Sequence, residues 1–186
     1  MMCKTIRTIS FPIMGLLLLF ASCDKTETFD DRWKLENEAQ FEKIAAYSEY
    51  QRLDSKSGKG YIMYKEIQSG AGATPYFTDK VKVLYTGWYK NSWSQPDSYT
   101  DNKGNLIQNK IIFDSTGNRN DIPSIFAVNG VVDGFSTALQ HMQVGDKWEV
   151  WIPWELGYGK AGSGRIPAYT TLVFEIELVD IVGATN

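Results

Sequence analysis

The feature that most constrains the fold is a change in hydrophobic period near residue 60. Beyond that point apolar and polar residues alternate, so that in the run 170–181 Leu172 and Phe174 fall on one face and Glu175 on the other. An alternation of period two is typical of strands with one buried face. Similar runs occur at residues 61–66, 81–85 and 147–152. The pattern predicts a domain made mostly of antiparallel sheet.

Helical spacing is found in two places. Residues 30 to about 53 contain neither Gly nor Pro, and Trp33, Phe41 and Ile44 recur at helical spacing after the acidic Asp30, which suits a helix N-terminus. A second, shorter helix is predicted where apolar residues fall on one helical face, namely Val132, Phe135, Leu139 and Met142. We therefore expect an α+β fold, with one short helix packed on the sheet and an N-terminal helical extension.

The first residues carry a separate signal. Lys4 and Arg7 precede an apolar run at residues 9–20, which is about 12 residues long and too short to cross a bilayer. The tetrapeptide Phe-Ala-Ser-Cys that ends at Cys23 resembles a bacterial lipobox, so residues 1–22 are predicted to be a lipoprotein signal peptide. Lipidation of Cys23 would anchor the chain to a membrane of the bacterial cell envelope, at the periplasmic face or the outer-membrane surface. The alternative is an ordinary buried or unpaired thiol.

Two polar stretches mark boundaries in the rest of the chain. Residues 55–60, Ser-Lys-Ser-Gly-Lys-Gly, break the helical pattern and predict a linker. Residues 91–109 are rich in Asn, Ser and Asp and predict a long loop, of the kind that is usually functional or mobile. We expect a lipid-anchored tether and helix at 23–57, then a sheet domain at 58–186 with a loop insertion at 91–109.

Composition excludes several kinds of chemistry. The 19 Lys and Arg residues are outnumbered by 22 Asp and Glu residues, which disfavours a nucleic-acid partner. His141 is the single histidine, and Cys3 and Cys23 are lost or blocked if the signal is processed. No metal site, nucleophilic catalysis or cofactor is therefore expected, and no glycine-rich phosphate loop is present.

The distinctive motifs are apolar and aromatic. They include Tyr85 in Val-Leu-Tyr-Thr-Gly, Phe113 and Asp114 in Ile-Phe-Asp-Ser-Thr, Phe135 in Val-Val-Asp-Gly-Phe and Tyr158 in Gly-Tyr-Gly. An Ile-Pro pair and the strand Leu-Val-Phe-Glu-Ile-Glu-Leu follow. In this order, over about residues 61–181, the motifs resemble the FKBP-type peptidyl-prolyl cis-trans isomerases.

The resemblance implies a twisted antiparallel half-barrel wrapped around one short helix. It also implies an isomerase that acts on proline-containing polypeptide clients outside the cytoplasm. Carried over by position, the catalytic residues would be Tyr85, Phe113, Asp114, Val132, Phe135, Tyr158 and Phe174. The additional substrate-binding residues would be Phe126, Val131 and Ile166. Phe135 would form the pocket floor, and the Val132 N–H and the Tyr158 hydroxyl would donate to substrate carbonyls.

Such a pocket agrees with the missing nucleophile, metal and cofactor. Rotation about a peptide bond has a barrier of about 18–20 kcal/mol, because planarity carries resonance. No bond is made or broken, so a catalyst needs only to bind the twisted amide better than either planar form. A dry aromatic pocket can do this by removing water from the more polar planar amide.

Departures from the family pattern leave alternatives open. Phe135 replaces a common tryptophan, Ser124 stands where many members carry phenylalanine, and the 91–109 insertion with Trp93 and Tyr99 could cover the pocket or recruit clients. A non-catalytic family member that holds partners is therefore the second hypothesis. A third is a glycan-binding lipoprotein that stacks sugars on exposed tryptophans, among Trp88, Trp93, Trp148, Trp151 and Trp154. The oligomeric state, the clients and the residue preferred before proline stay open.

Overall fold

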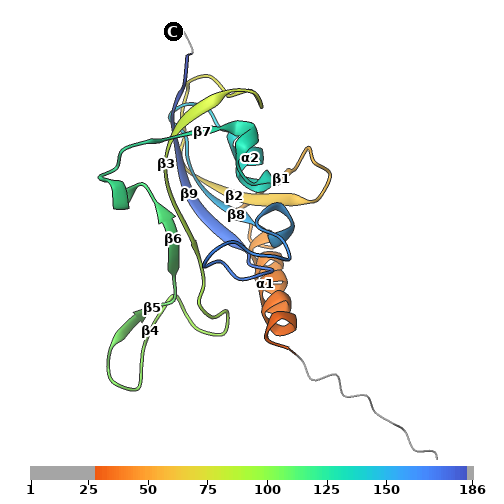
Figure 1. Ribbon diagram of the computed structural model, residues 1–186, viewed down its shortest axis with the longest axis vertical. Helices are drawn as coiled ribbons and strands as arrows, with labels where there is room; N and C mark the ends of the chain where they lie inside the picture. Colours follow the sequence, from red (N-terminus) through yellow and green to blue (C-terminus); the bar gives the residue numbers. More distant parts are fainter. Residues whose placement is uncertain (1–27, 184–186) are drawn as a thin grey trace, which may run out of the picture.

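A computed structural model describes residues 28–183 and shows an α+β fold (Figure 1). The helices are α1 (Phe29–Ala45) and α2 (Asp133–Leu139), with short 3-10 turns η1 (Gly117–Arg119), η2 (Val128–Gly130) and η3 (Trp154–Leu156). The strands are β1 (Gln51–Asp54), β2 (Tyr61–Gln68), β3 (Lys80–Tyr89), β4 (Ser98–Thr100), β5 (Leu106–Gln108), β6 (Ile111–Ser115), β7 (Ser124–Ala127), β8 (Lys147–Ile152) and β9 (Leu172–Ile181). The four strand regions expected from the alternation correspond to β2, β3, β8 and β9.

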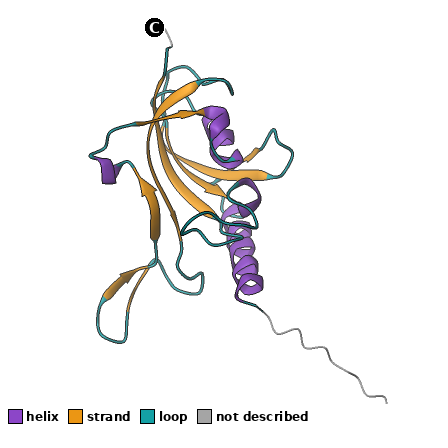
Figure 2. Ribbon diagram, in the orientation of Figure 1, coloured by secondary structure: helices purple, strands orange, loops and turns teal. Residues whose placement is uncertain are grey.

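Within the described residues, seven strands form one antiparallel sheet, and five of them follow the order β1-β2-β8-β9-β3. The far edge of β3 is shared: β7 pairs with its first half and β6 with its second half. This arrangement brings β6 and β7, which are separated by η1, to one side of the same long strand. The sheet curves around α2 (Figures 1 and 2).

The core lies between α2 and the concave face of the sheet. Every residue of α2 from Gly134 to Leu139 is buried. The helix can lie this close to β8 because Gly134 has no side chain, since a Cβ there would stand 2.3 Å from Cγ2 of Ile152. The predicted short helix is therefore confirmed, and its N-terminus is fixed against the sheet.

The opposite face of the sheet is partly covered by α1. Phe41 and Ile44 pack with Met63, Trp151 and Val173, all of them buried. These sheet residues alternate with the core residues on the concave face, as a period of two requires. The helix is therefore a part of the folded body, and it lies against the start of β9.

Buried polar contacts fix α1 in register with the chain before β9. The backbone N–H of Thr171 donates to Oδ1 of Asn37 at 2.7 Å, and the Asn37 amide donates to the Trp33 carbonyl at 2.7 Å. The Trp33 indole N–H donates to Oγ1 of Thr170 at 3.0 Å. Because Asn37 is fully buried, loss of its side chain would leave the Thr171 N–H without a partner.

The first predicted helix ends earlier than expected. It begins at Phe29, capped by Thr28 and Asp31, but stops at Ala45 and does not continue to about residue 53. Residues Gln51–Asp54 instead form β1, in which Leu53 pairs with Ile62 of β2. Pairing with a neighbouring strand satisfies the backbone there and overrides a sequence that has no helix breaker. Residues 55–60, expected to be a linker, are the turn between β1 and β2.

The 91–109 insertion is more ordered than a long loop. Part of it forms the β4–β5 ribbon, which lies just before the start of β6 (Figure 1). Asn109 is 1% exposed and donates to the carbonyls of Ser92 and Gln95 at 2.7 and 3.0 Å, which closes the base of the ribbon. Trp93 packs against Trp151, with ring centroids 6.2 Å apart. The insertion is thus attached beside α1.

The predicted signal peptide and Cys23 lie outside the described residues. Within residues 28–183, no helix has the length and apolar character needed to cross a membrane.

Candidate active site

A cavity of about 310 Å³ opens between α2, β3, β6, β7 and the loop that follows η3. Its volume is at the lower end of the range for small-ligand sites, about 300–1,000 Å³. It is lined by Tyr85, Phe113, Asp114, Phe126, Gly130, Val131, Val132, Phe135, Tyr158 and Phe174. We call it the proline pocket. The fold brings every predicted pocket residue except Ile166 into this lining.

Ile166 is 7% exposed and is buried in the same core cluster as Phe135 and Phe174, but it does not line this cavity. Its backbone pairs with Ser163, with N–H to carbonyl distances of 2.9 and 3.0 Å in the two directions. This bridge closes a tight turn in the chain at Ile166. The structure therefore does not bring Ile166 to the pocket lining.

The pocket floor is a set of perpendicular aromatic rings. Phe135 is 3% exposed, and its ring lies edge-on to Phe174 at 5.0 Å, to Tyr85 at 6.1 Å and to Phe126 at 6.2 Å between centroids. Edge-to-face packing of this kind fixes ring orientation as well as burying area. The floor is therefore rigid, apolar and closed to water from below.

One polar network forms the rim of the pocket. The Tyr85 hydroxyl donates to the Asp114 carboxylate. Arg119 donates to Oδ1 of Asp114 at 2.9 Å and to the Tyr85 hydroxyl oxygen at 3.2 Å. The single carboxylate of the pocket is thus neutralised by a cation at the same rim.

Burial and this network shift the pKa values of the rim residues. Burial, then the hydrogen bond to Asp114, raises the pKa of Tyr85 to about 12. For Asp114, partial burial raises the pKa, but the hydrogen bonds from Tyr85 and Arg119 outweigh it and leave the pKa below its ordinary value. Both groups therefore keep one protonation state at neutral pH: Tyr85 neutral and Asp114 ionised.

Two donors at the pocket have no partner within residues 28–183. The Val132 backbone N–H precedes the first turn of α2, and the Val132 carbonyl accepts from Ser136 at 3.0 Å. Tyr158 is 37% exposed, and burial, then the charge of Asp114, raises the pKa of its hydroxyl. Both donors can therefore bind a carbonyl oxygen of a ligand.

The comparisons with known proteins agree with this geometry. The family model for FKBP-type peptidyl-prolyl cis-trans isomerases matches residues 72–179. The chain belongs to this family. It is 42% identical over 122 residues to the FKBP-type 22 kDa peptidyl-prolyl cis-trans isomerase of Escherichia coli, across 65% of this chain and 50% of the relative. It is 36% identical over 121 residues to outer membrane protein MIP of Legionella longbeachae, across 64% of this chain and 44% of the relative.

A solved structure shows the same fold. The crystal structure of FkpA from Escherichia coli matches with a TM-score of 0.62 and 29% sequence identity, and the match covers 82% of this chain and 60% of that chain. The chain spans about half the length of the two curated FKBP-type and MIP relatives.

Sequence reasoning missed two residues of this FKBP-type pocket. The 3-10 turn η1 brings Arg119 to Asp114. In the sequence, the only sign of this contact is a basic residue five positions after the acidic one. Gly87 lies beneath the wall, where a Cβ would stand 2.6 Å from ring atoms of both Phe113 and Phe174. Its signal is a glycine inside an otherwise alternating strand.

Ser124 does not line the FKBP-type pocket. Its Oγ accepts from Arg119 at 3.3 Å, so it supports the rim network. Phe126, two residues further along β7, supplies the wall. No residue of the 91–109 insertion lines the pocket. Within residues 28–183, no cluster of three His, Cys, Asp or Glu side chains is placed to hold a metal ion.

Proposed function

We propose that the protein is a peptidyl-prolyl cis-trans isomerase that acts on proline-containing polypeptide clients of the bacterial cell envelope. The observation that carries this proposal is the closed aromatic floor around Phe135 beside two donors without partners, Val132 N–H and the Tyr158 hydroxyl. Family membership supports it. This chain spans only about half the length of these curated relatives, so its activity has to be measured on the chain itself.

The apolar part of the pocket would work by shape and desolvation. A proline ring seats on Phe135 between the walls of Phe113 and Phe174, where it displaces water. The X–Pro carbonyl leaves the amide plane as the bond rotates, and it loses the conjugation that made it a strong acceptor in water. An apolar surrounding therefore costs the twisted amide less than the planar one.

The donors would hold the rest of the client while the bond turns. Val132 N–H and the Tyr158 hydroxyl bind carbonyl oxygens on the client backbone, so that one side of the X–Pro bond is fixed and the other rotates. Asp114, held by Tyr85 and Arg119, presents a fixed negative charge near the twisting amide. No proton is transferred in this mechanism, and no covalent bond is formed or broken.

Location follows from the predicted lipid anchor. Cys23 precedes α1 by a short polar stretch, so a lipidated Cys23 would tether the folded body close to a membrane of the cell envelope. Clients emerge there as unfolded chains, and X–Pro exchange takes tens to hundreds of seconds without a catalyst. The name of the Legionella relative, outer membrane protein MIP, supports an envelope location.

The test is the cis-to-trans rate of short uncharged X–Pro peptides with the purified chain, across several residues before proline. We expect a clear acceleration that falls when Tyr158 is changed to Phe, because one donor is lost. The absence of acceleration from folded protein, for every residue before proline, would contradict the proposal and would leave a protein that binds partners on an isomerase fold.

A further inference from the structure

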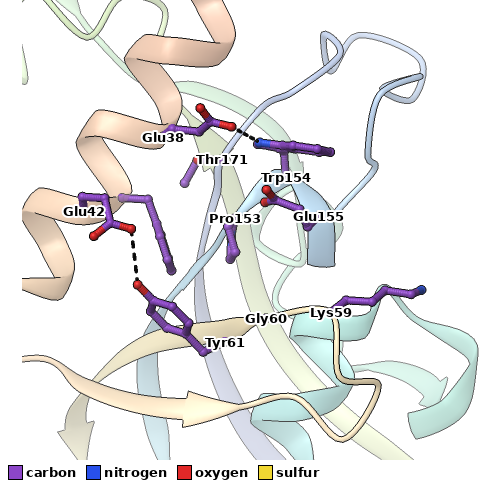
Figure 3. A pocket seen from close by; sticks show the side chains of 10 residues that line it. Glu38, Glu42, Lys59, Gly60, Tyr61, Pro153, Trp154, Glu155 and Thr171 are labelled. Atoms are coloured by element: carbon purple, nitrogen blue, oxygen red, sulfur yellow. Dashed lines mark hydrogen bonds between the residues drawn. The ribbon is translucent and has the colours of Figure 1, made fainter.

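A second cavity, of about 420 Å³, lies between α1, the β1–β2 turn and η3, outside the proline pocket (Figure 3). We call it the α1 groove. Its side chains combine aromatic rings with carboxylates: Glu38, Phe41, Glu42, Tyr61, Trp154 and Glu155. The mechanism proposed above uses none of these residues.

The aromatic walls of the α1 groove are held in place. The ring centroids of Phe41 and Tyr61 are 5.3 Å apart. The Trp154 indole N–H donates to Oε1 of Glu38 at 3.1 Å, and the Tyr61 hydroxyl donates to Oε1 of Glu42 at 3.4 Å, as Figure 3 shows. The groove is therefore built by contacts between the helix and the sheet domain.

The charges of the α1 groove are unbalanced. Three carboxylates line it, and Lys59, the one lysine in its lining, extends away from the other side chains and pairs with Asp133 at 3.1 Å (Figure 3). Glu38 pairs with Lys34 at 3.6 Å, but within residues 28–183 neither Glu42 nor Glu155 has an ion pair. The charge of the groove is therefore negative, which is complementary to a cationic ligand.

The aromatic rings of the groove also favour a cation. The Arg52 guanidinium carbon lies 3.8 Å from the Tyr61 ring centroid, and Lys34 Nζ lies 5.6 Å from that of Trp154. These contacts with cations of the chain itself show that both rings take part in cation–π interactions. A lysine or arginine side chain can bury its aliphatic stem against such rings and keep its charged end at the carboxylates.

The groove and the proline pocket share two segments of chain. Glu155 precedes Tyr158 by three residues, and Gly159 N–H donates to the Trp154 carbonyl at 2.9 Å, so one tight turn borders both cavities. On the other side, Asp133 pairs with Lys59 and directly follows Val132. An extended client rises about 3.3 Å per residue, so the number of residues between its proline and a bound basic side chain would report the spacing of the two cavities.

We propose that the α1 groove binds a lysine or arginine side chain of the same client segment whose proline occupies the proline pocket. The groove would thereby favour clients that carry a basic residue a short distance from proline. This inference rests on the proposed function, because it assigns the preferred client of that same site.

The test uses matched X–Pro peptides with a single lysine or, at the same position, a glutamine. The position is moved from about two to about eight residues from the proline, on either side, which covers about 7–26 Å of extended chain. We expect kcat/KM for the best lysine peptide to exceed that of its glutamine match by about fivefold, because of a lower KM. This is the size of effect expected for a partly exposed ion pair with an aromatic contact. In Glu42→Gln/Glu155→Gln this ratio should fall to about one.

Glutamine keeps an acceptor for the Tyr61 hydroxyl, so this double variant removes charge with little change in shape. The matched control is Glu36→Gln/Glu66→Gln, which removes two carboxylates outside the groove and should leave the lysine-to-glutamine ratio unchanged. An equal loss of the ratio in the control would show a general charge effect and overturn the inference.

Failure of the inference is separable from failure of the proposed function. Acceleration of every peptide without any lysine preference would overturn the inference and leave the isomerase intact. If no peptide is accelerated, fluorescence anisotropy of the labelled peptides still tests the groove. Tighter binding of the lysine peptide, lost in Glu42→Gln/Glu155→Gln, would support the groove as a cation site. Equal binding of the lysine and glutamine peptides would overturn the inference. A change from dimer to monomer in the double variant without lysine preference would assign the groove to a second copy of the chain and also overturn the inference.

Discussion

The proline pocket and the α1 groove border the same turn after η3, yet their charges differ: the charge of the pocket is neutralised and that of the groove is not. The pocket holds one carboxylate, Asp114, and neutralises it with Arg119 at 2.9 Å. The groove holds three carboxylates and turns its lysine away. Both have aromatic walls, so the difference lies in the polar groups alone. An apolar cavity with a neutralised rim suits an uncharged ring and a twisting amide, whereas an acidic one suits a cation.

The two regions also depend on different parts of the chain. The pocket is formed by α2, β3, β6 and β7, within the span that the family model matches. The groove needs α1, which precedes that span. Catalysis should therefore follow residues on the α2 side of the sheet, and residues on the α1 side should affect stability and client choice. Each prediction below tests this division.

The largest expected effect is that of Phe135→Ala. It removes the pocket floor, so we expect kcat/KM for an uncharged X–Pro peptide to fall about 100-fold, which corresponds to about 2.7 kcal/mol. The free energy of unfolding should also fall by about 3 kcal/mol, because a buried ring is lost. Peptide isomerisation and urea denaturation measure the two effects.

The control for that experiment is Ile44→Ala on the α1 side. Ile44 is 5% exposed and packs with Met63, Trp151 and Val173, so its loss should also cost about 3 kcal/mol of stability. Activity at a temperature where the variant is folded should stay within about twofold of wild type. Equal losses of activity in Phe135→Ala and Ile44→Ala would contradict the idea that catalysis depends on the α2 side of the sheet and not on the α1 side.

A smaller effect is expected from Gly87→Ala. A new Cβ would stand 2.6 Å from ring atoms of Phe113 and Phe174, and β3 has a register shift toward β6 at this residue. The two rings must move apart, so we expect about a tenfold loss in kcat/KM with a smaller loss of stability than in Phe135→Ala. Unchanged activity would show that the walls need no exact spacing.

Asp114→Asn should have a weaker effect again. The hydrogen bond from Tyr85 can persist, but the ion pair with Arg119 is lost, and we expect about a threefold fall in kcat/KM. Asp180→Asn is the matched control, since Asp180 forms a partly exposed ion pair with Lys82 at 2.8 Å and neither residue lines the pocket. A similar fall in the control would mean that net charge, and not the rim, determines the rate.

The sequence predicted the sheet, the short helix and nearly all of the pocket lining. Alternation and helical spacing indicate which face of a strand or helix is buried. The order of the motifs pointed to the FKBP-type family, and the resemblance then gave the pocket residues by position. The sequence did not predict β1 or the β4–β5 ribbon, because these short strands have no clear alternation of apolar and polar residues. β1 forms by pairing with β2, and β4 forms by pairing with β5. Leu53, for example, is one apolar residue that becomes a strand residue only through Ile62.

For the same reason, the sequence did not predict two pocket residues. Arg119 becomes part of the site through η1, which places it beside Asp114. Gly87 matters because two rings from other strands meet above it. Ile166 was expected in the pocket; it is buried in a turn that a bridge with Ser163 closes, and it does not line the cavity. These positions are set by tertiary contacts that no local pattern records.

The pH dependence of stability provides a further check on the rim. The folded-state pKa of Asp114 is lowered by Tyr85 and Arg119 against the effect of partial burial, so Asp114 contributes stability above its ordinary pKa of about 3.9. That contribution is lost as the pH falls through the lower folded-state value. In Asp114→Asn it should be absent, so acid unfolding of the variant should lack this part of the pH dependence.

The central claim is that an apolar pocket accelerates X–Pro rotation without proton transfer. The most direct test is kcat/KM of the wild-type chain for one uncharged X–Pro peptide from about pH 5 to about pH 9. Asp114 stays ionised throughout this range, and Tyr85, with its pKa raised to about 12, stays neutral. The account predicts a clear acceleration that varies by less than about twofold. A bell-shaped profile with a pKa inside that range, or no acceleration at any pH, would contradict it.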